Sequence, residues 1–389
     1  MTSLERCKAF GVTNIRGMAY MPGPSNYTKN QQGTLYFDSD FYNGDFIDLW
    51  QTGGSSGSGR GDLSRFKDRL GVNFIHCYDW SAPIPDLALR IHSGFLADCS
   101  HFGMKATIPI SNYTMQLLSQ GKVNEAGANV GKIFNEIYPS TGLVRGAGMW
   151  KIFNEYELNF DRNPAHVVKV MNWLVEMEDN RSLPDAARMP IMVDASFGVK
   201  DGIPGAGYIR DVWNALMAAG KIGSYTPDGF WKERFVFATN PQNDASYIKN
   251  YLSNLLPNYW QKNNIPTPPV MFTELGSSIE QTGSEEKQAE WLSAQIEASL
   301  PGTSNGMMLG ACVFLNEERP WETGPEQTFG IMRFGSDTEW GRPPKNFQAT
   351  TYFPGWGAGG KVEKWKGTYP VEQQRPKLNY ASVAKAWHS

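Results

Sequence analysis

Short apolar runs alternate along the chain with longer stretches in which apolar residues recur at helical spacing. The runs are rich in β-branched and aromatic residues and are nearly continuously hydrophobic, which is typical of parallel strands covered on both faces. They predict about eight strands, at 14–20, 72–80, 104–110, 149–154, 190–195, 234–239, 270–274 and 308–315. The stretches between them predict helices at 63–70, 86–102, 124–137, 165–178, 207–219, 245–262 and 284–298.

Strands that alternate with helices favour a parallel sheet, either open or closed. No dinucleotide-binding fingerprint follows the first strand, and the number of repeats suits closure. We therefore predict a (β/α)₈ TIM barrel. Length alone slightly favours two domains for 389 residues, but barrels of this kind reach such lengths through loop insertions, so we expect one domain over 1–389.

Two segments lie outside the barrel repeat. An insertion at about 21–61 follows the first strand, and its Gly- and Ser-rich centre at 51–61 is either a lid over the substrate or a mobile decoration. A Gly-, Pro- and aromatic-rich extension at about 340–389 is expected to wrap over the barrel and to end in a short helix near Val383.

Composition and charge limit the classes of partner that the protein is expected to bind. The net charge of −3 is spread without a basic stripe, so nucleic acid is not expected, and no apolar run is long enough for a membrane span. Aromatic residues make up 13% of the chain, which suits sugar faces as well as a core. The 4 cysteines are widely spaced and predict neither disulfides nor zinc; no metal or cofactor motif appears. Residues 1–8 lack the apolar region of a signal peptide, although a secreted mature form stays open.

The strongest chemical candidates are two carboxylates at strand ends. Glu155 closes the fourth predicted strand in GMWKIFNEYEL, and Glu274 closes the seventh in PVMFTELGSS. On a barrel, both ends face the pocket in which chemistry takes place. Glycoside cleavage requires such a pair, one residue as acid and the other to meet the anomeric carbon. Lys151, by contrast, is placed near a strand start and is not expected to form a Schiff base.

An Asn-Glu pair after strand four and a Glu at the end of strand seven resemble the clan A glycoside hydrolases. The resemblance implies a retaining mechanism in which Glu155 is the acid/base, Glu274 is the nucleophile and Asn154 donates to a sugar hydroxyl. In a retaining enzyme the two carboxyl groups stand about 5–5.5 Å apart. The segments RGMAYMPG, FKDRLGVNFIHCYDW and FTELG are similar in style to β-1,3-glucanases and β-1,3-glucanosyltransferases.

The chain also departs from that clan. Asn240 stands where clan members usually place a Tyr after strand six, and Arg16 is the only candidate for the Arg that usually reaches the nucleophile. Other residues at strand ends are candidates for substrate binding, with a structural role as the open alternative. The same two roles are open for Asp194, at the end of strand five. The predicted substrate-binding set is Asn154, Tyr20, Tyr78, Asp79, Trp80, Asn112, Asn240, Asn316 and Trp321.

The sequence thus predicts a retaining glycoside hydrolase or transglycosylase that acts on a β-glucan without a cofactor. Two alternatives stay open. One is a related enzyme for another β-linked polysaccharide such as mannan or galactan, and the other is a barrel that binds carbohydrate without cleaving it. Oligomeric state, linkage and the choice between hydrolysis and transfer are not determined by the sequence.

Overall fold

The computed structural model describes residues 1–23, 40–54, 59–80, 91–140, 142–335, 345–353 and 363–388, with side chains omitted at 345–353 and 363–371. Parts of the predicted insertion at 21–61, of its proposed lid at 51–61 and of the extension at 340–389 lie outside the described residues, as does the start of the predicted helix 86–102.

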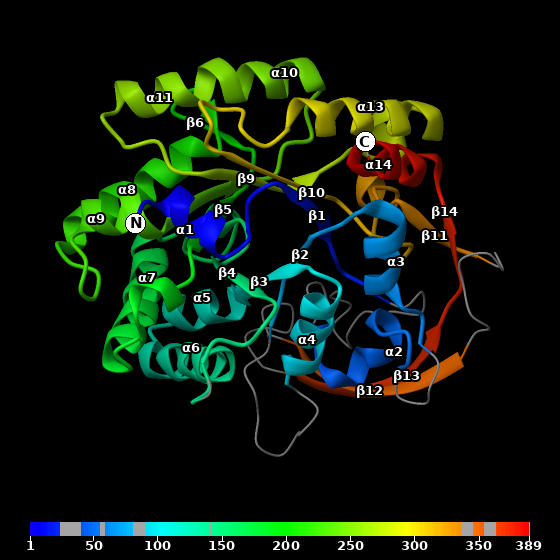
Figure 1. Ribbon diagram of the computed structural model, residues 1–389, viewed down its shortest axis with the longest axis horizontal. Coiled ribbons are helices and arrows are strands. Elements are labelled where there is room, and N and C mark those ends of the chain that lie inside the picture. Colours follow the sequence, from blue (N-terminus) through cyan, green and yellow to red (C-terminus); the bar gives the residue numbers. More distant parts are fainter. Residues whose placement is uncertain are drawn as a thin grey trace.

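In the described part of the chain, parallel strands close into a barrel at the centre of the molecule (Figure 1). β1 pairs on one side with β2 and on the other with β10, which closes the circle. The predicted (β/α)₈ TIM barrel is therefore confirmed. In chain order the barrel strands are β1 (Ile15–Ala19), β2 (Phe74–His76), β3 (Lys105–Ile110), β4 (Ala147–Ile152), β5 (Ile191–Ala195), β8 (Phe235–Thr239), β9 (Val270–Leu275) and β10 (Met308–Val313).

The helices surround the barrel and mostly match the predicted spacing. α7 begins with Pro164 at its first position, where the fixed φ favours helix, and the Asn163 side chain caps it. The matching helices are α3 (Asp62–Leu70), α4 (Ser93–His101), α6 (Val123–Ile137), α7 (Pro164–Asn180), α8 (Ala206–Ala219), α10 (Ala245–Asn250), α11 (Leu256–Lys262) and α13 (Glu285–Ala298). The predicted helix at 245–262 contains a π-helical segment, Tyr251–Leu255.

Several short elements were not predicted. They are α1 (Ser3–Ala9), α2 (Ile47–Trp50), α5 (Asn112–Ser119), α9 (Pro227–Arg234), α12 (Ile279–Thr282), the hairpin of β6 (Val199–Lys200) and β7 (Ile203–Pro204), and the 3₁₀ turns Gly44–Phe46, Tyr156–Leu158, Asp185–Ala187 and Gly324–Gln327. Most are too short to show a clear period in the sequence.

The chain after the barrel returns along its outside. β11 (Met332–Phe334) pairs with β14 (Gln374–Pro376), and β12 (Lys345–Phe353) pairs with β13 (Glu363–Val371). The last helix, α14 (Leu378–His388), confirms the predicted helix near Val383 and packs against α13 and α3 (Figure 1).

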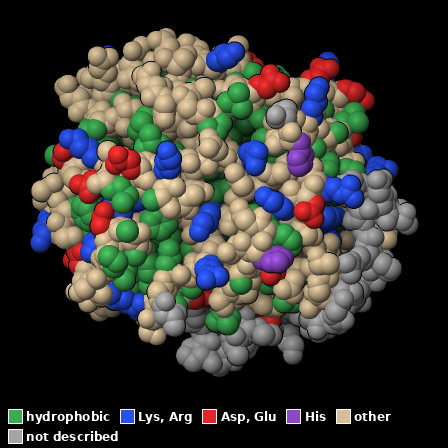
Figure 2. Space-filling view, viewed as in Figure 1, with side chains coloured by type: hydrophobic (Ala, Val, Ile, Leu, Met, Phe, Trp, Pro, Cys, Tyr) green, Lys and Arg blue, Asp and Glu red, His purple; other side chains and the backbone are tan. Residues whose placement is uncertain are grey.

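Within the described residues no helix has the length and apolarity needed to cross a bilayer. The cysteines all lie in this part of the chain, and each is buried and unpaired, as expected for small apolar side chains in a packed core. Figure 2 shows acidic and basic side chains interspersed over one face of the molecule.

The closing seam of the barrel depends on close backbone approach. Gly310 of β10 has a φ of +127°, and a Cβ there would overlap the backbone of Ile15 in β1. A Cβ at Gly17 of β1 would likewise overlap the side chain of Cys312 in β10. Glycine is required at Gly310 because the position combines a left-handed backbone with no room for a side chain.

We predict that Gly310→Ala lowers the free energy of unfolding by about 2–4 kcal/mol, since backbone strain and overpacking add. Gly121→Ala is the matched control: Gly121 has a φ of +74° but open space around it, so strain alone should cost about 1 kcal/mol. Urea unfolding followed by circular dichroism measures both. Equal losses in the two variants would contradict the role of close packing at the seam.

Candidate functional site

Glu155 is presented by a sharply turned loop that follows β4. Phe153 has a φ of 60° and Glu155 a φ of 44°, so two residues with side chains adopt the left-handed region on either side of Asn154. Such conformations cost of order 1–3 kcal/mol each and persist only where the surroundings hold them. The turn places Glu155 immediately beyond the carboxyl end of the fourth barrel strand, as the sequence predicted.

Hydrogen bonds from Asn112, at the start of α5, and from Asn159, farther along the same loop, hold this turn. The backbone N–H of Asn154 donates to Oδ1 of Asn112 at 2.8 Å, and Nδ2 of Asn112 donates back to the Asn154 carbonyl at 3.1 Å. Nδ2 of Asn159 donates to the carbonyls of Asn154 and Glu155, each at 3.0 Å. The oxygen and the nitrogen of the Asn112 amide are therefore both hydrogen-bonded to the loop. The expected contact of Asn112 with substrate stays a prediction.

A buried lysine lies beneath the same loop. Nζ of Lys151 donates to Oδ1 of Asn154 at 2.6 Å, lies 3.0 Å from Nε2 of His76 and lies 3.5 Å from Oδ2 of Asp194. Lys151 is the fifth residue of β4 and fully buried, so the expectation that it stands near a strand start is wrong. Burial and the nearby ammonium group hold the pKa of His76 well below its ordinary value, which keeps this ring neutral and able to accept a hydrogen bond.

Asn240, at the end of β8, contacts Glu155 directly. Its Nδ2 donates to Oε1 of Glu155 at 3.0 Å, and its Oδ1 accepts from the hydroxyl of Thr273. The same hydroxyl lies 3.1 Å from Oδ1 of Asp194. Asn240 thus occupies the place that was predicted for it after strand six, with Glu155 as its observed partner.

Glu274, the fifth residue of β9, shares the electrostatic environment of Glu155. Removal from bulk water raises the pKa of Glu274 well above its ordinary value, and the negative charges of Glu155 and Asp194 raise it further, while Lys151 opposes them. Burial also raises the pKa of Asp194 to about 6, against the lowering effect of Lys151. The charges of the two predicted catalytic carboxyls therefore interact at the carboxyl end of the barrel, and the charge of Glu155 favours the protonated form of Glu274.

Glu157, two residues beyond Glu155, has a structural contact. Its Oε1 accepts a hydrogen bond from the backbone N–H of Ser196 at 2.6 Å, which joins the loop after β4 to the loop after β5. Burial raises the pKa of Glu157.

Tyr78 lies beside this centre, whereas Trp321 and Asn316 lie in the loop after β10 and contact the loop after β1. The ring of Tyr78 is 4.8 Å from Nζ of Lys151, which places it on the wall next to the buried lysine. Trp321, in the loop after β10, is partly exposed and packs closely against Gly23 of the loop after β1. Asn316 joins the same two loops, because its Oδ1 accepts from the backbone N–H of Met21 at 2.8 Å.

Other members of the predicted set have buried partners within the protein. The hydroxyl of Tyr20 donates to Asp62 at 2.9 Å, and Asp62 is in turn paired with Arg60 at 2.7 Å. Oδ1 of Asp79 accepts from the backbone N–H of Trp80 at 2.8 Å. Tyr20 is fully buried, so its observed role is to anchor the loops around Asp62.

Trp80 is also fully buried and belongs to a cluster around His92. Its ring lies 3.8 Å from that of His92, and its Nε1 donates to Glu136 at 3.4 Å. His92 lies between the carboxylates of Asp40 and Glu136, which raise its pKa against the opposing effect of burial. Direct binding of substrate by Tyr20, Asp79 or Trp80 stays a prediction.

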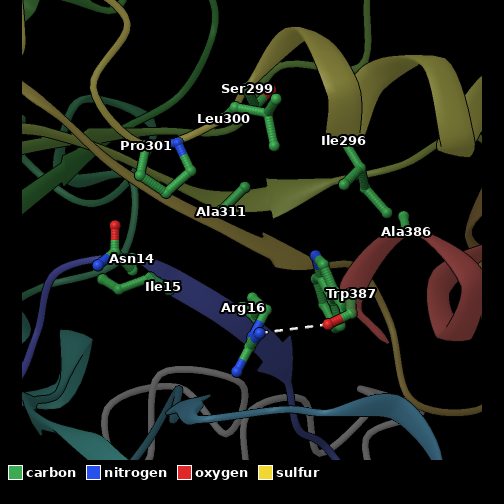
Figure 3. A pocket seen from close by; sticks show the side chains of 10 residues that line it. All are labelled: Asn14, Ile15, Arg16, Ile296, Ser299, Leu300, Pro301, Ala311, Ala386 and Trp387. Atoms are coloured by element: carbon green, nitrogen blue, oxygen red, sulfur yellow. Dashed lines mark hydrogen bonds between the residues drawn. The ribbon is translucent and has the colours of Figure 1, made fainter. Parts of the chain in front are cut away.

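Arg16 does not reach the nucleophile. Its side chain leaves β1 on the outer side of the barrel and donates to the backbone carbonyl of Trp387 at 3.2 Å (Figure 3). It lines a cavity of about 280 Å³ between the start of β1, the chain after α13 and the end of α14. Because Arg16 lies near the start of β1, this cavity is at the opposite end of the strands from Glu155, and the expectation for Arg16 is wrong.

The fold and the site together define a TIM barrel with two interacting carboxyl groups at the ends of its fourth and seventh strands. No family model matches the sequence, and no curated protein matches it. Among solved structures, the chain is similar to β-glucosidase 2 from the fungus Trichoderma reesei, with a TM-score of 0.51, 12% identity and coverage of 97% of this chain and 98% of that one. It is also similar to a GH5-4 broad-specificity endoglucanase from Clostridium acetobutylicum, with a TM-score of 0.50, 11% identity and coverage of 85% and 94%.

A third similarity is to a GH2 β-galacturonidase from Eisenbergiella tayi, with a TM-score of 0.45 and 14% identity. This comparison covers 85% of the present chain but only 47% of that protein, so the chain spans less than half of its length. At such identities the first two similarities, to the β-glucosidase and the endoglucanase, show the shared barrel fold alone.

The buried cation predicts a pH-dependent effect on stability. We expect Lys151→Met to lower the free energy of unfolding by about 3–5 kcal/mol at pH 7.5, because Asp194 is left buried without its cation. In the variant the folded-state pKa of Asp194 rises further above its unfolded value, so the loss should shrink toward pH 4.5, where Asp194 is protonated in both proteins. Chemical denaturation at the two pH values measures this, and a pH-independent loss would contradict it.

Proposed function

We propose that the protein is a retaining glycoside hydrolase or transglycosylase that acts on β-linked glucan. The observation that carries the proposal is the placement of Glu155 and Glu274 at the ends of the fourth and seventh barrel strands, where the charge of Glu155 raises the pKa of Glu274. A paired acid and carboxylate at this end of a barrel is the arrangement that glycoside cleavage needs. The β-glucosidase and the endoglucanase that share the fold support glucan as the first substrate class to examine.

In the first step, Glu155 gives its proton to the oxygen of the leaving sugar as the bond from that oxygen to the anomeric carbon breaks. The bonding electron pair goes to the leaving oxygen, and a carboxylate oxygen of Glu274 forms a bond to the anomeric carbon. In the second step, Glu155 takes a proton from water or from a sugar hydroxyl, whose oxygen then displaces Glu274. Hydrolysis and transfer differ only in this acceptor, and both give net retention.

Asn154 is suited to hold the sugar during these steps. Because Lys151 binds its amide oxygen at 2.6 Å, the Nδ2 group is the end that can donate to a substrate hydroxyl. Tyr78, Asn316 and Trp321 complete the proposed substrate-binding surface. We place Trp321 there because it is partly exposed on the loop after β10, at the catalytic end of the barrel.

We expect Glu274→Ala to lower kcat/KM at least ~10³-fold on the substrate that the wild type cleaves best, since the covalent step is lost. Reducing-sugar release from β-1,2-, β-1,3-, β-1,4- and β-1,6-glucans, mannan and galactan identifies that substrate. Products longer than the donor would indicate transfer. Exposed Glu290→Ala is the matched control and should retain full activity.

Glu155→Ala should show a different pattern. Loss of the acid should slow cleavage of natural linkages by about 10²–10⁴-fold but should slow aryl glycosides with good leaving groups much less in the first step. Azide, which needs no deprotonation, should then restore turnover of the variant.

The stereochemistry is tested with the wild type. Proton NMR of the first sugar that it releases should show the β-anomer. Wild-type activity in Glu274→Ala, or an initial α-anomer, would contradict the proposal, whereas oligosaccharide binding without turnover would favour a carbohydrate-binding barrel.

A further inference from the structure

A chain of hydrogen-bonding groups connects Glu155 to a second, fully buried carboxyl. Oε1 of Glu155 accepts from Nδ2 of Asn240 at 3.0 Å, Oδ1 of Asn240 accepts from the hydroxyl of Thr273, and that hydroxyl lies 3.1 Å from Oδ1 of Asp194. Thr273 and Asp194 are completely buried, and Asn240 nearly so, so water does not substitute freely for any link.

The hydrogens of this chain can be counted. Thr273 has one hydroxyl hydrogen and cannot donate to both Asn240 and Asp194. If it donates to Asn240, the Asn240 amide turns its N–H toward Glu155. The Thr273 oxygen must then accept a hydrogen bond from the O–H of a protonated Asp194. If it donates to an ionised Asp194, the Asn240 amide turns over, its N–H donates to Thr273, and its carbonyl faces Glu155, which must then carry a proton. Each arrangement thus holds one carboxyl proton, which is on Asp194 in the first arrangement and on Glu155 in the second.

The charges around Asp194 make both arrangements accessible. Lys151 of β4, at 3.5 Å, favours the ionised form, whereas burial together with Glu157 beyond β4 favours the neutral form. Glu274 of β9 and the buried thiol of Cys312 in β10 also face it, and His76 of β2 is neutral and bonded to Lys151. The balance puts the pKa of Asp194 at about 6, close to neutral pH.

We propose that Asp194 is a positioning residue that sets, through Thr273 and Asn240, whether Glu155 faces a hydrogen-bond donor or an acceptor. The inference rests on the proposed role of Glu155 as acid/base. With Asp194 ionised, the carbonyl of Asn240 stabilises protonated Glu155, the form that donates to the leaving group. With Asp194 neutral, the N–H of Asn240 stabilises the Glu155 carboxylate, the form that accepts a proton.

Asp194→Asn should fix the chain in the arrangement of a neutral Asp194, in which the N–H of Asn240 faces Glu155. Lys151 would bind the new amide oxygen, so the amide nitrogen would donate to Thr273 and Thr273 to Asn240. The carboxylate of Glu155 would then be favoured, and its pKa would fall. The basic limb of the kcat/KM profile, which reports loss of the acid proton, should move to lower pH by about one unit.

The loss of a negative charge at position 194 would also lower the pKa of Glu155, so the test is made in a double-mutant cycle. In a Thr273→Val background the chain is cut but the charge effect remains, and the shift caused by Asp194→Asn should fall to less than half. Thr273→Ser keeps the hydroxyl and should restore the full shift. Thr107→Val, at a buried threonine bonded to Cys77, is the control for loss of a core hydroxyl and should leave the limb in place.

An equal shift with and without the Thr273 hydroxyl would overturn the inference, as would no shift at all, while the wild-type activity would still uphold the proposed function. If Asp194→Asn does not fold, the comparison of Thr273→Val with Thr273→Ser tests the inference by itself. Only Thr273→Val should move the basic limb of the kcat/KM profile to lower pH. A basic limb at the same pH in both variants would overturn the inference. An inactive wild type across the glycan panel would instead overturn the proposed function. Thermal unfolding checks that each variant is folded.

Discussion

The ammonium group of Lys151 joins the interior of the barrel to the loop that presents Glu155. A buried cation is costly unless its donors are satisfied, and Lys151 faces acceptors on His76, Asn154 and Asp194, at 3.0, 2.6 and 3.5 Å. The bond to Asn154 fixes the middle of the strained turn, and the charge lowers the cost of ionising Asp194. The lowered pKa of His76 follows from its burial and from the same contact. The conformation of the turn and the charge of Asp194 thus both depend in part on this side chain.

The strained turn around Asn154 has a clear physical rationale in this setting. Left-handed residues at Phe153 and Glu155 oppose folding locally, and the bonds from Asn112, Asn159 and Lys151 offset that cost. A loop held by several neighbours has few alternative conformations, so the carboxyl group is oriented before substrate arrives. Preorganisation of this kind lowers the entropy that must be lost when the reacting groups meet.

The sequence predicted the barrel because nearly continuous apolar runs and helical periods are backbone-scale signals. It also located Glu155 and Glu274, since carboxylates at the ends of such runs are conspicuous. It could not tell which residues point inward: a parallel strand covered on both faces lacks the alternation that separates its two sides. Arg16 was therefore expected at the nucleophile although it points outward, and Lys151, which lies inside the barrel near the end of β4, was placed near a strand start. The partners of Tyr20 and Trp80 lie far away along the chain.

The charge balance of the centre makes the position of its protons the variable on which the proposed mechanism depends. Glu274 interacts electrostatically with both Glu155 and Asp194, and the ammonium group of Lys151, which lies 3.5 Å from Asp194, cannot neutralise all three carboxyls. Burial and neighbouring negative charges raise the pKa of Glu274 and of Asp194, so each carboxyl holds a proton more readily than an isolated one. Charge alone does not decide which carboxyl holds it. A hydroxyl and an amide, which can each reverse their hydrogen bonds without moving their heavy atoms far, supply that choice at little cost in packing.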